Sequence, residues 1–328
     1  MRMQVLFLVG AGVLGASLFA GCGSAEEARG SVKEAQDSVV LIEARGVWSD
    51  VFENAEARSV AGTGFVIDDS GHILTNNHVV TGASVITVED GDQSYPAKLV
   101  GKDECADLAV LEVENYARPA LQWAGEDPEP DTDVWALGHA GGGDLAVTRG
   151  TVRRRPSHQD TSWASVDGVL EHSAYLEGGS SGGPLVLEDG RVVGVNFAQS
   201  SNTAIGFAIG GEYGSRITQR LVSGDSSDSI GIAGEAFRVS LDDGTPFFGV
   251  WINAVQAGSP AGRAGLQPGD MIATLQSLRV GEDGTLKDYC ETIRSNGARA
   301  VMDIQVLRFS DDDSVKIMEG QINGAQLR

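Results

Sequence analysis

Residues 62–80 read GTGFVIDDSGHILTNNHVV, and this stretch decides the fold class. Two apolar runs flank the turn-forming residues 68–71 (Asp-Asp-Ser-Gly), a pattern typical of two antiparallel strands joined by a tight turn. Further short apolar runs, separated by Gly, Asp and Pro, cover residues 38–44, 84–90, 95–101, 107–113, 133–139, 190–197 and 204–209. Because no helices alternate with these runs, the chain predicts a mainly β fold, either an antiparallel barrel or a sandwich.

The composition limits both the size and the partners of the protein. The chain has 328 residues, which suits about two domains. Hydrophobic residues make up 41% of it, an ordinary share for a protein with a buried core, and the formal net charge is −22. A nucleic-acid-binding surface needs a basic stripe, so this acidity argues against a nucleic-acid partner and is more simply a solubility feature.

The first residues predict a secretory signal. Arg2 precedes an apolar or small run from Val5 to Ala20, which is short for a membrane-spanning helix. Cys22 follows small residues and resembles the lipidated cysteine of a bacterial lipobox, with Phe19 where leucine is usual. We expect a lipoprotein signal peptide over residues 1–21, lipidation and membrane anchoring through Cys22, and a tether over residues 22–35. The alternative is an ordinary signal peptide with an incidental cysteine.

Two cysteines remain, Cys105 and Cys290, and they lie in different predicted domains. They could pair as a disulfide in an oxidising compartment. We expect instead that each is a small buried residue. Their spacing fits no metal site, and the five histidines include no HExxH arrangement. The sequence therefore predicts neither a metal nor another cofactor.

The pattern changes after Gly210. Residues 213–222 predict a short helix, and the segment SGDSSDS (223–229) has the composition of a linker. We therefore expect one domain over residues 36–222 and a second over residues 230–328.

Within the second domain, the stretch 286–295 predicts a helix. One buried face of this helix is expected to carry Leu286, Tyr289, Cys290 and Ile293, which are spaced i, i+3, i+4 and i+7. A final strand pair is expected over residues 300–309 and 314–322.

Three side chains in the first domain could carry chemistry. His78 follows a predicted strand, Asp107 precedes a strongly apolar one, and Ser181 lies in the glycine-rich run EGGSSGGPLV (177–186). Each is weak evidence alone, because a lone histidine is usually structural, a lone aspartate often caps a turn, and a Gly/Ser cluster can be a loop. Their order along one β-rich domain, His then Asp then Ser, is the order of a chymotrypsin-type triad.

The blocks around these residues resemble the HtrA/Deg family of serine proteases. The matching segments are residues 62–83, DECADLAVLEV (103–113) and GSSGGPLVLEDGRVVGVNF (179–197), while GSPAGRAGLQPGDMI (258–272) resembles the family's C-terminal PDZ domain. The resemblance implies a chymotrypsin-like protease domain with two six-stranded β-barrels and an active site between them. A β-rich PDZ domain with one or two helices would follow.

By this resemblance, Ser181 is the nucleophile, His78 the general base and Asp107 the residue that orients the histidine. The backbone N–H groups of Gly179 and Ser181 would form the oxyanion hole. Ser180 would fill the variable slot between these two donors, where its side chain is dispensable.

Substrate specificity is harder to infer from the sequence. The resemblance places the S1 pocket at Tyr175, Leu176, Asn196, Phe197 and Ala198, none of them acidic, which predicts cleavage after small or medium apolar residues. Glu177 is the competing candidate, since it would attract a basic side chain if it faced inward. The family's usual motifs are replaced by Gly138-His139-Ala140 and by His172-Ser173-Ala174, which leaves regulation and specificity open.

The assembly is also an expectation from the family. The short loop expected over residues 47–61 replaces the long insertion of some relatives and argues against a large cage. A homotrimer is the family default.

The resemblance also implies the partners. A PDZ domain binds a peptide C-terminus beside one strand and one helix, with backbone N–H groups on the carboxylate. The matching loop is Ser229-Ile230-Gly231-Ile232, beside the helix expected over 286–295, and packing against the protease domain is the alternative. We expect an envelope serine endopeptidase that degrades misfolded or unfolded proteins. The alternatives are a regulatory protease with a narrow substrate and a non-catalytic chaperone or scaffold.

Overall fold

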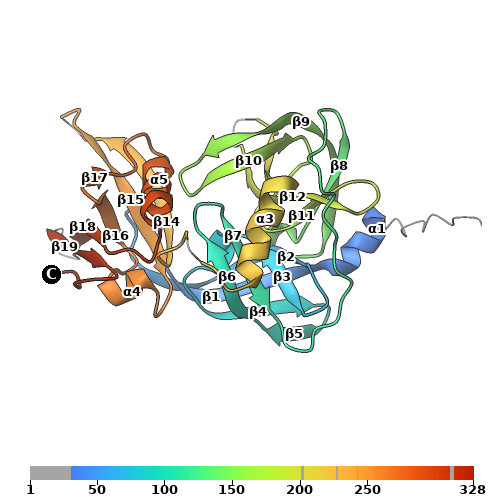
Figure 1. Cartoon of the computed structure of the whole chain (residues 1–328), viewed down its shortest axis with the longest axis horizontal. Coiled ribbons are helices and arrows are strands. Elements are labelled where there is room, and N and C mark those ends of the chain that lie inside the picture. Colours follow the sequence, from blue (N-terminus) through green and yellow to red (C-terminus); the bar gives the residue numbers. More distant parts are fainter. Residues whose placement is uncertain (1–30, 201–202, 227, 242, 311–313) are drawn as a thin grey trace, which may run out of the picture.

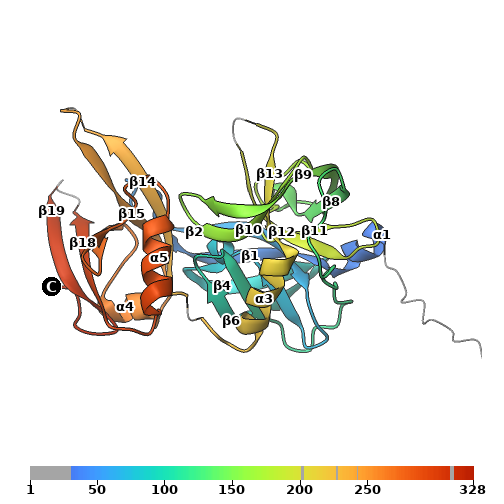
Figure 2. The same cartoon turned by 45° about the horizontal axis from the view of Figure 1, so that its top comes forward.

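The computed structural model describes residues 31–200, 203–226, 228–241, 243–310 and 314–328. It contains three β-rich bodies (Figure 1). The first two pack together in the larger part of the molecule, and the third lies beside them at one end (Figure 1 and Figure 2). The expected signal peptide and the lipidation site Cys22 lie outside the described residues. Within the described ranges, no helix is long and apolar enough to cross a membrane.

The first body is a seven-stranded antiparallel sheet in the order β5-β4-β1-β2-β3-β7-β6. The hairpin expected within residues 62–80 is present, with Phe65 of β2 paired to Leu74 of β3. This sheet has one strand more than the six-stranded barrel implied by the family. Its strands are β1 (Val39–Trp48), β2 (Glu56–Val66), β3 (His72–Thr75), β4 (Ala83–Asp90), β5 (Gln93–Pro96), β6 (Lys98–Asp103) and β7 (Leu108–Glu112).

The second body is a closed six-stranded barrel in the order β10-β13-β12-β11-β8-β9. The long hairpin of β9 and β10 was not expected from the sequence. Its first strand reads AVTRGTVRRRPSHQD, which lacks the apolar alternation that marks a strand. The strands are β8 (Asp133–Gly138), β9 (Ala146–Asp160), β10 (Ser165–His172), β11 (Pro184–Val186), β12 (Val192–Gln199) and β13 (Gly206–Gly210).

Helix α3 (Gly211–Val222) joins the first two bodies, since it contacts β6 and β7 of the sheet and β12 and β13 of the barrel. Its approach to β6 is close. A Cβ on Gly101 would lie 2.5 Å from the carbonyl oxygen of Leu221, so only glycine fits there. The shorter helical segments in this half are α1 (Val32–Ala35), α2 (Asn77–Val80) and two 3₁₀ turns, Gln36–Ser38 and Ala140–Gly142.

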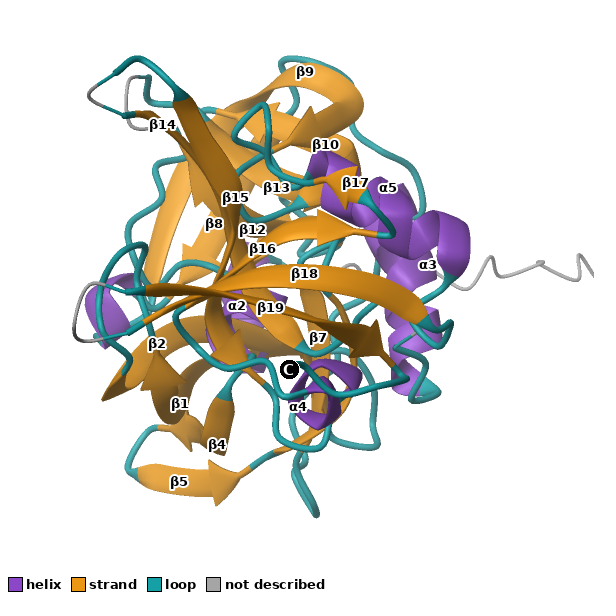
Figure 3. Ribbon diagram, turned by 90° about the vertical axis from the view of Figure 1, so that its left-hand side faces the viewer, coloured by secondary structure: helices purple, strands orange, loops and turns teal. Residues whose placement is uncertain are grey.

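The third body is a sheet in the order β14-β15-β16-β18-β19, with β17 paired to β16 (Figure 3). Helix α5 packs on it as expected, because Leu286, Tyr289, Cys290 and Ile293 are all buried. The elements are β14 (Ile232–Ser240), β15 (Pro246–Val255), α4 (Pro260–Ala264), β16 (Asp270–Leu275), β17 (Leu278–Arg279), α5 (Lys287–Asn296), β18 (Met302–Phe309) and β19 (Val315–Ile322).

Two sequence expectations about chain boundaries need correction. The loop expected over residues 47–61 is much shorter, because β1 and β2 stay paired as far as Trp48 and Glu56. The tether expected over residues 22–35 ends earlier, because α1 is folded and Ala35 packs in a core shared by the first two bodies.

The two cysteines are buried, as expected, but they are paired, which the sequence left as the alternative. Cys105 and Cys290 form a disulfide with their Cα atoms 5.6 Å apart, and 185 residues separate them in the sequence. Cys105 follows β6 in the first body, whereas Cys290 lies on α5 in the third. The bond therefore ties the two expected domains together, and burial in a shared apolar cluster protects it from solvent.

We expect this cross-link to contribute strongly to stability, because it closes a long loop in the unfolded chain. The chain-entropy account gives roughly 2–5 kcal/mol for such a bond. Replacing both cysteines with alanine should therefore lower the free energy of unfolding in urea by that order. Mass spectrometry of a tryptic digest without reductant should show one peptide pair joined through Cys105 and Cys290. Two free, alkylatable thiols in the oxidised protein would contradict the pairing.

Candidate active site

His78 and Asp107 are brought together from two neighbouring elements of the first body. His78 lies on the single turn α2, and Asp107 lies just before β7. The imidazole Nδ1 is 2.7 Å from Asp107 Oδ2, and the backbone N–H of His78 donates to Oδ1 at 2.9 Å. Both carboxylate oxygens are therefore engaged by one residue, which fixes the orientation of the ring.

The position of Asp107 is also held from behind. Its backbone has φ of 53°, in the left-handed region that aspartate tolerates better than most residues. Asn76 Nδ2 donates to the Asp107 carbonyl oxygen at 2.8 Å, and the Asn77 N–H donates to the same oxygen at 3.2 Å. The carboxylate is 1% exposed, so water competes little for it.

Electrostatics favour a charged His78 more than in water. Burial alone would lower the pKa of His78, but the charge of Asp107 and its hydrogen bond outweigh burial and raise the pKa above its ordinary value. A histidine held in this way keeps its Nε2 free for a proton and stabilises the imidazolium that results.

Ser181 shares a cavity with His78. The cavity has a volume of about 440 Å³, and its lining includes His78, Ser181, Phe197 and Ala198, together with residues of β14 and α5. In the part of the chain that the structure describes, no hydrogen bond joins the Ser181 hydroxyl to the imidazole. Such bonds are often long in ligand-free enzymes and shorten when substrate binds.

The loop before Ser181 contains a glycine in a backbone conformation that other residues rarely adopt. Gly179 has φ of 94°, and a Cβ there would lie 2.4 Å from the His139 carbonyl oxygen, so only glycine fits. Among the described residues, the N–H groups of Gly179 and Ser181 have no acceptor. Two backbone donors are thus left available beside the predicted nucleophile.

Thr63 of β2 holds this loop in place, a contact that the sequence did not predict. The hydroxyl of Thr63 donates to the Gly179 carbonyl oxygen at 2.7 Å and accepts from the His139 N–H at 2.8 Å. Its own N–H donates to the Ser181 carbonyl oxygen at 2.8 Å. One threonine of the first body therefore positions both predicted oxyanion donors of the second. A threonine inside a strand gives no signal of such a role.

The residues expected to form S1 are divided between two places. Phe197 and Ala198 line the cavity with His78 and Ser181, but Tyr175 and Leu176 line a separate hollow of about 50 Å³ with Glu177. Asn196 is buried, and its side chain and N–H both donate to the Gly183 carbonyl oxygen. Asn196 therefore supports the nucleophile loop from behind, and the S1 assignment of Tyr175, Leu176 and Asn196 stays a prediction.

The loop Ser229–Ile232 lies between the two halves of the molecule and does bind a carboxylate. That carboxylate is the side chain of Glu104, three residues before Asp107. Glu104 was not singled out from the sequence, because a glutamate between strands is usually exposed.

Comparisons with known proteins agree with this arrangement. Residues 62–195 match the trypsin-like peptidase domain model, and residues 251–306 match the PDZ domain model. A Chlamydia pneumoniae protein named "Probable periplasmic serine endoprotease DegP-like" is 35% identical over 236 residues, which covers 68% of this chain and 48% of that protein. The chain thus spans about half the length of the curated relatives it matches.

Solved structures are similar as well. The active form of the Rv3671c protease from M. tuberculosis is 30% identical with a TM-score of 0.52, and the match covers 61% of this chain and 86% of that one. The HtrA-type protease AlgW, solved with a decapeptide, is 22% identical with a TM-score of 0.54, covering 90% and 97%. That second likeness supports the fold alone.

The fold and the site define a trypsin-like serine protease domain followed by a PDZ domain. Within this class, the chain belongs to the HtrA family.

The contacts of Thr63 give a testable consequence. Thr63→Val keeps the shape of the side chain but removes the hydroxyl that links the Gly179 and His139 backbones. Misplacing an oxyanion donor costs about 10²-fold or more in turnover, so casein cleavage should slow markedly. Thr63→Ser should retain most of the rate, and Thr87→Val in β4 serves as the matched control. Equal rates for Thr63→Val and the control would show that the hydrogen bonds of the Thr63 hydroxyl are not needed for cleavage.

Proposed function

We propose that this protein is a serine endopeptidase of the cell envelope that cleaves unfolded or misfolded polypeptides. The observation that carries the proposal is the 2.7 Å contact between His78 and Asp107 on the wall of the cavity that Ser181 shares. A binding module would need none of these three residues, whereas peptide-bond hydrolysis needs all of them.

The proposed mechanism follows from this geometry. Ser181 attacks the peptide carbonyl carbon while His78 Nε2 takes its proton. The oxyanion that forms is stabilised by the N–H groups of Gly179 and Ser181. His78 then returns the proton to the leaving amine, and water repeats the sequence to release the acyl group. Asp107 remains ionised, keeps the ring in place and stabilises its charged form.

The two predicted S1 residues that lie in the cavity support an apolar preference at the bond that is cut. Phe197 and Ala198 are the predicted S1 residues that lie with Ser181, and neither can pair with a basic side chain. Glu177, the alternative, is exposed and lines the separate hollow.

Three observations support action in the envelope. The N-terminal sequence predicts export and lipidation at Cys22. A structural disulfide suits an oxidising compartment. A relative of similar sequence is named a periplasmic serine endoprotease. For the PDZ domain, we propose that the loop Ser229–Ile232 binds the C-termini of polypeptides.

The two neighbouring serines should respond differently to substitution. Ser181→Ala removes the proposed nucleophile and should abolish casein cleavage by the chain without its first 22 residues. Ser180→Ala should keep most of the activity, because the hydrogen bond of the Ser180 hydroxyl among the described residues is a 3.3 Å contact accepted from the Glu177 N–H. Gel analysis of casein digestion measures both. Equal loss in the two variants, or undiminished cleavage by Ser181→Ala, would contradict the assignment.

Activity should fall in acid as His78 becomes protonated. Because Asp107 raises the pKa of His78, the acidic limb of kcat/KM should have its midpoint above about 6.5, the ordinary histidine value. Cleavage of a fluorogenic peptide between pH 4 and 9 measures this. Circular dichroism at each pH separates protonation from unfolding. A rate that stays constant down to pH 4 in folded protein would exclude His78 as the base.

A further inference from the structure

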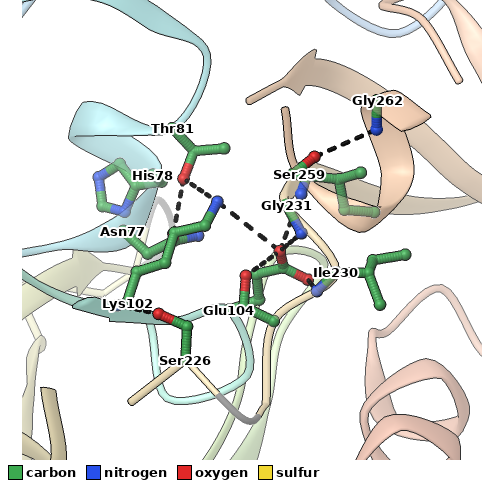
Figure 4. Close-up of polar contacts among 12 residues, drawn as sticks. Asn77, His78, Thr81, Lys102, Glu104, Ser226, Ile230, Gly231, Ser259 and Gly262 are labelled. Carbon is green, nitrogen blue, oxygen red and sulfur yellow. Dashed lines mark hydrogen bonds and ion pairs between the residues drawn. The ribbon is translucent and has the colours of Figure 1, made fainter. Parts of the chain in front are cut away.

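Glu104 is a buried carboxylate that belongs to one domain by sequence and to the other by contact. It follows β6 in the protease domain, and its side chain is 4% exposed. Figure 4 shows the side chain reaching across the domain boundary to the backbone of Ile230 and Gly231. A buried carboxylate needs several hydrogen-bond donors to offset the loss of water.

The PDZ domain supplies these donors. Glu104 Oε1 accepts from the N–H groups of Gly231 at 2.6 Å and Ile232 at 2.8 Å, and from the Ser229 hydroxyl at 2.6 Å. Oε2 accepts from the Ile230 N–H at 3.3 Å and the Tyr289 hydroxyl at 2.8 Å. Successive backbone N–H groups that converge on one carboxylate are how a PDZ loop captures a peptide C-terminus.

The position beside β14, where a peptide would add as a strand, is also occupied by the protease domain. The tip of the β9–β10 hairpin lies there. The Ser162 carbonyl oxygen accepts from the Ala236 N–H of β14 at 2.6 Å, and the Thr161 carbonyl oxygen accepts from the Leu286 N–H at the start of α5 at 2.9 Å. The protease domain thus provides both a carboxylate and backbone acceptors to the edge of the groove.

The disulfide keeps Glu104 near this loop. Cys105 is the next residue along the chain, and its partner Cys290 is next to Tyr289, one of the donors to Glu104. Tethering a ligand beside its site converts binding into an intramolecular event with a high effective concentration. A free peptide must compete with that concentration.

We infer that the Glu104 side chain is the resident ligand of the PDZ carboxylate site, and that a peptide C-terminus binds there only by displacing it. The inference rests on the proposed peptide-binding role of the loop Ser229–Ile232 and adds an internal competitor to it. An internal ligand that occupies a site nine-tenths of the time lowers the apparent affinity for an external one about tenfold.

A variant that removes the Glu104 charge also affects Lys102, its buried ion-pair partner. Its ammonium is 3% exposed, lies 3.7 Å from Glu104 Oε1 and donates to the Thr81 hydroxyl. Removing Glu104 alone would leave this charge buried without its carboxylate, which destabilises folding. The pair Lys102→Met with Glu104→Gln removes both charges and keeps the volume. Glu319→Gln is the control, because Glu319 is an exposed carboxylate on β19 of the same domain, where it accepts from the Gln305 side chain.

The first measurement needs no external ligand. Hydrogen exchange of the Gly231 and Ile232 amides is measured in the full chain without its first 22 residues, in a Ser181→Ala background. In the parent protein and in Glu319→Gln these amides should exchange slowly. In Glu104→Gln, alone and paired with Lys102→Met, they should exchange at least about tenfold faster, while the β18 amides stay protected. Unchanged protection of Gly231 and Ile232 in a folded variant overturns the inference.

The second measurement tests competition. The probe is a fluorescein-labelled pool of pentapeptides that are degenerate at four positions and end in a free valine, with the amidated pool as reference. The paired variant should bind the free-acid pool at least about tenfold more tightly than the parent does, and neither protein should bind the amidated pool. Equal affinity in parent and variant, or no binding by either, overturns the inference. Casein cleavage is measured separately on protein that retains Ser181. Failure of the proposed protease function is therefore distinguished from failure of this inference.

Discussion

The segment between β6 and β7 is the constraint on which the rest of the molecule depends. Three of the five residues 103–107 each contact a different part of the molecule. Glu104 accepts hydrogen bonds from the loop Ser229–Ile232, Cys105 is cross-linked to α5, and Asp107 holds His78. Asp103 closes the segment locally, because its carboxylate accepts from the Ala106 N–H at 2.8 Å. The position of Asp107, in a left-handed backbone conformation, is therefore fixed by contacts within its own domain and, through Glu104 and Cys105, by the PDZ domain.

This segment buries charge that an ordinary turn would leave in water. Burial lowers the pKa of Lys102 to about 8, opposed by the charge of Glu104, and burial raises the pKa of Asp103 to about 7. Each shift shows that the charged form is less favourable here than in solvent. Buried ionic groups seldom add net stability, but they strongly disfavour arrangements in which their partners are absent. The buried charges of Lys102, Asp103 and Glu104 therefore favour one docked arrangement of the domains more than they add to the free energy of unfolding.

The sequence predicted the elements whose signal is local. The hairpin at residues 62–80, the helix face from Leu286 to Ile293 and the final strand pair all follow from periodicity and turn residues, and the structure contains them. The order of His78, Asp107 and Ser181 was sufficient to propose a triad. Contacts between distant segments carry no such signal. The pairing of Cys105 with Cys290, the clamp by Thr63 and the burial of Glu104 each depend on how the domains pack. The Arg-rich strand β9 was missed because tertiary pairing, not apolar alternation, makes it a strand.

The central claim is that Ser181 is a nucleophile activated by His78. The most direct measurement is peptide mapping by mass spectrometry after reaction with diisopropyl fluorophosphate, which phosphorylates activated serines. The account predicts a single adduct, on Ser181 and not on Ser180, and its loss when His78 is replaced with alanine in a protein that remains folded. An adduct on Ser180, or labelling of Ser181 at the same rate without His78, would contradict it.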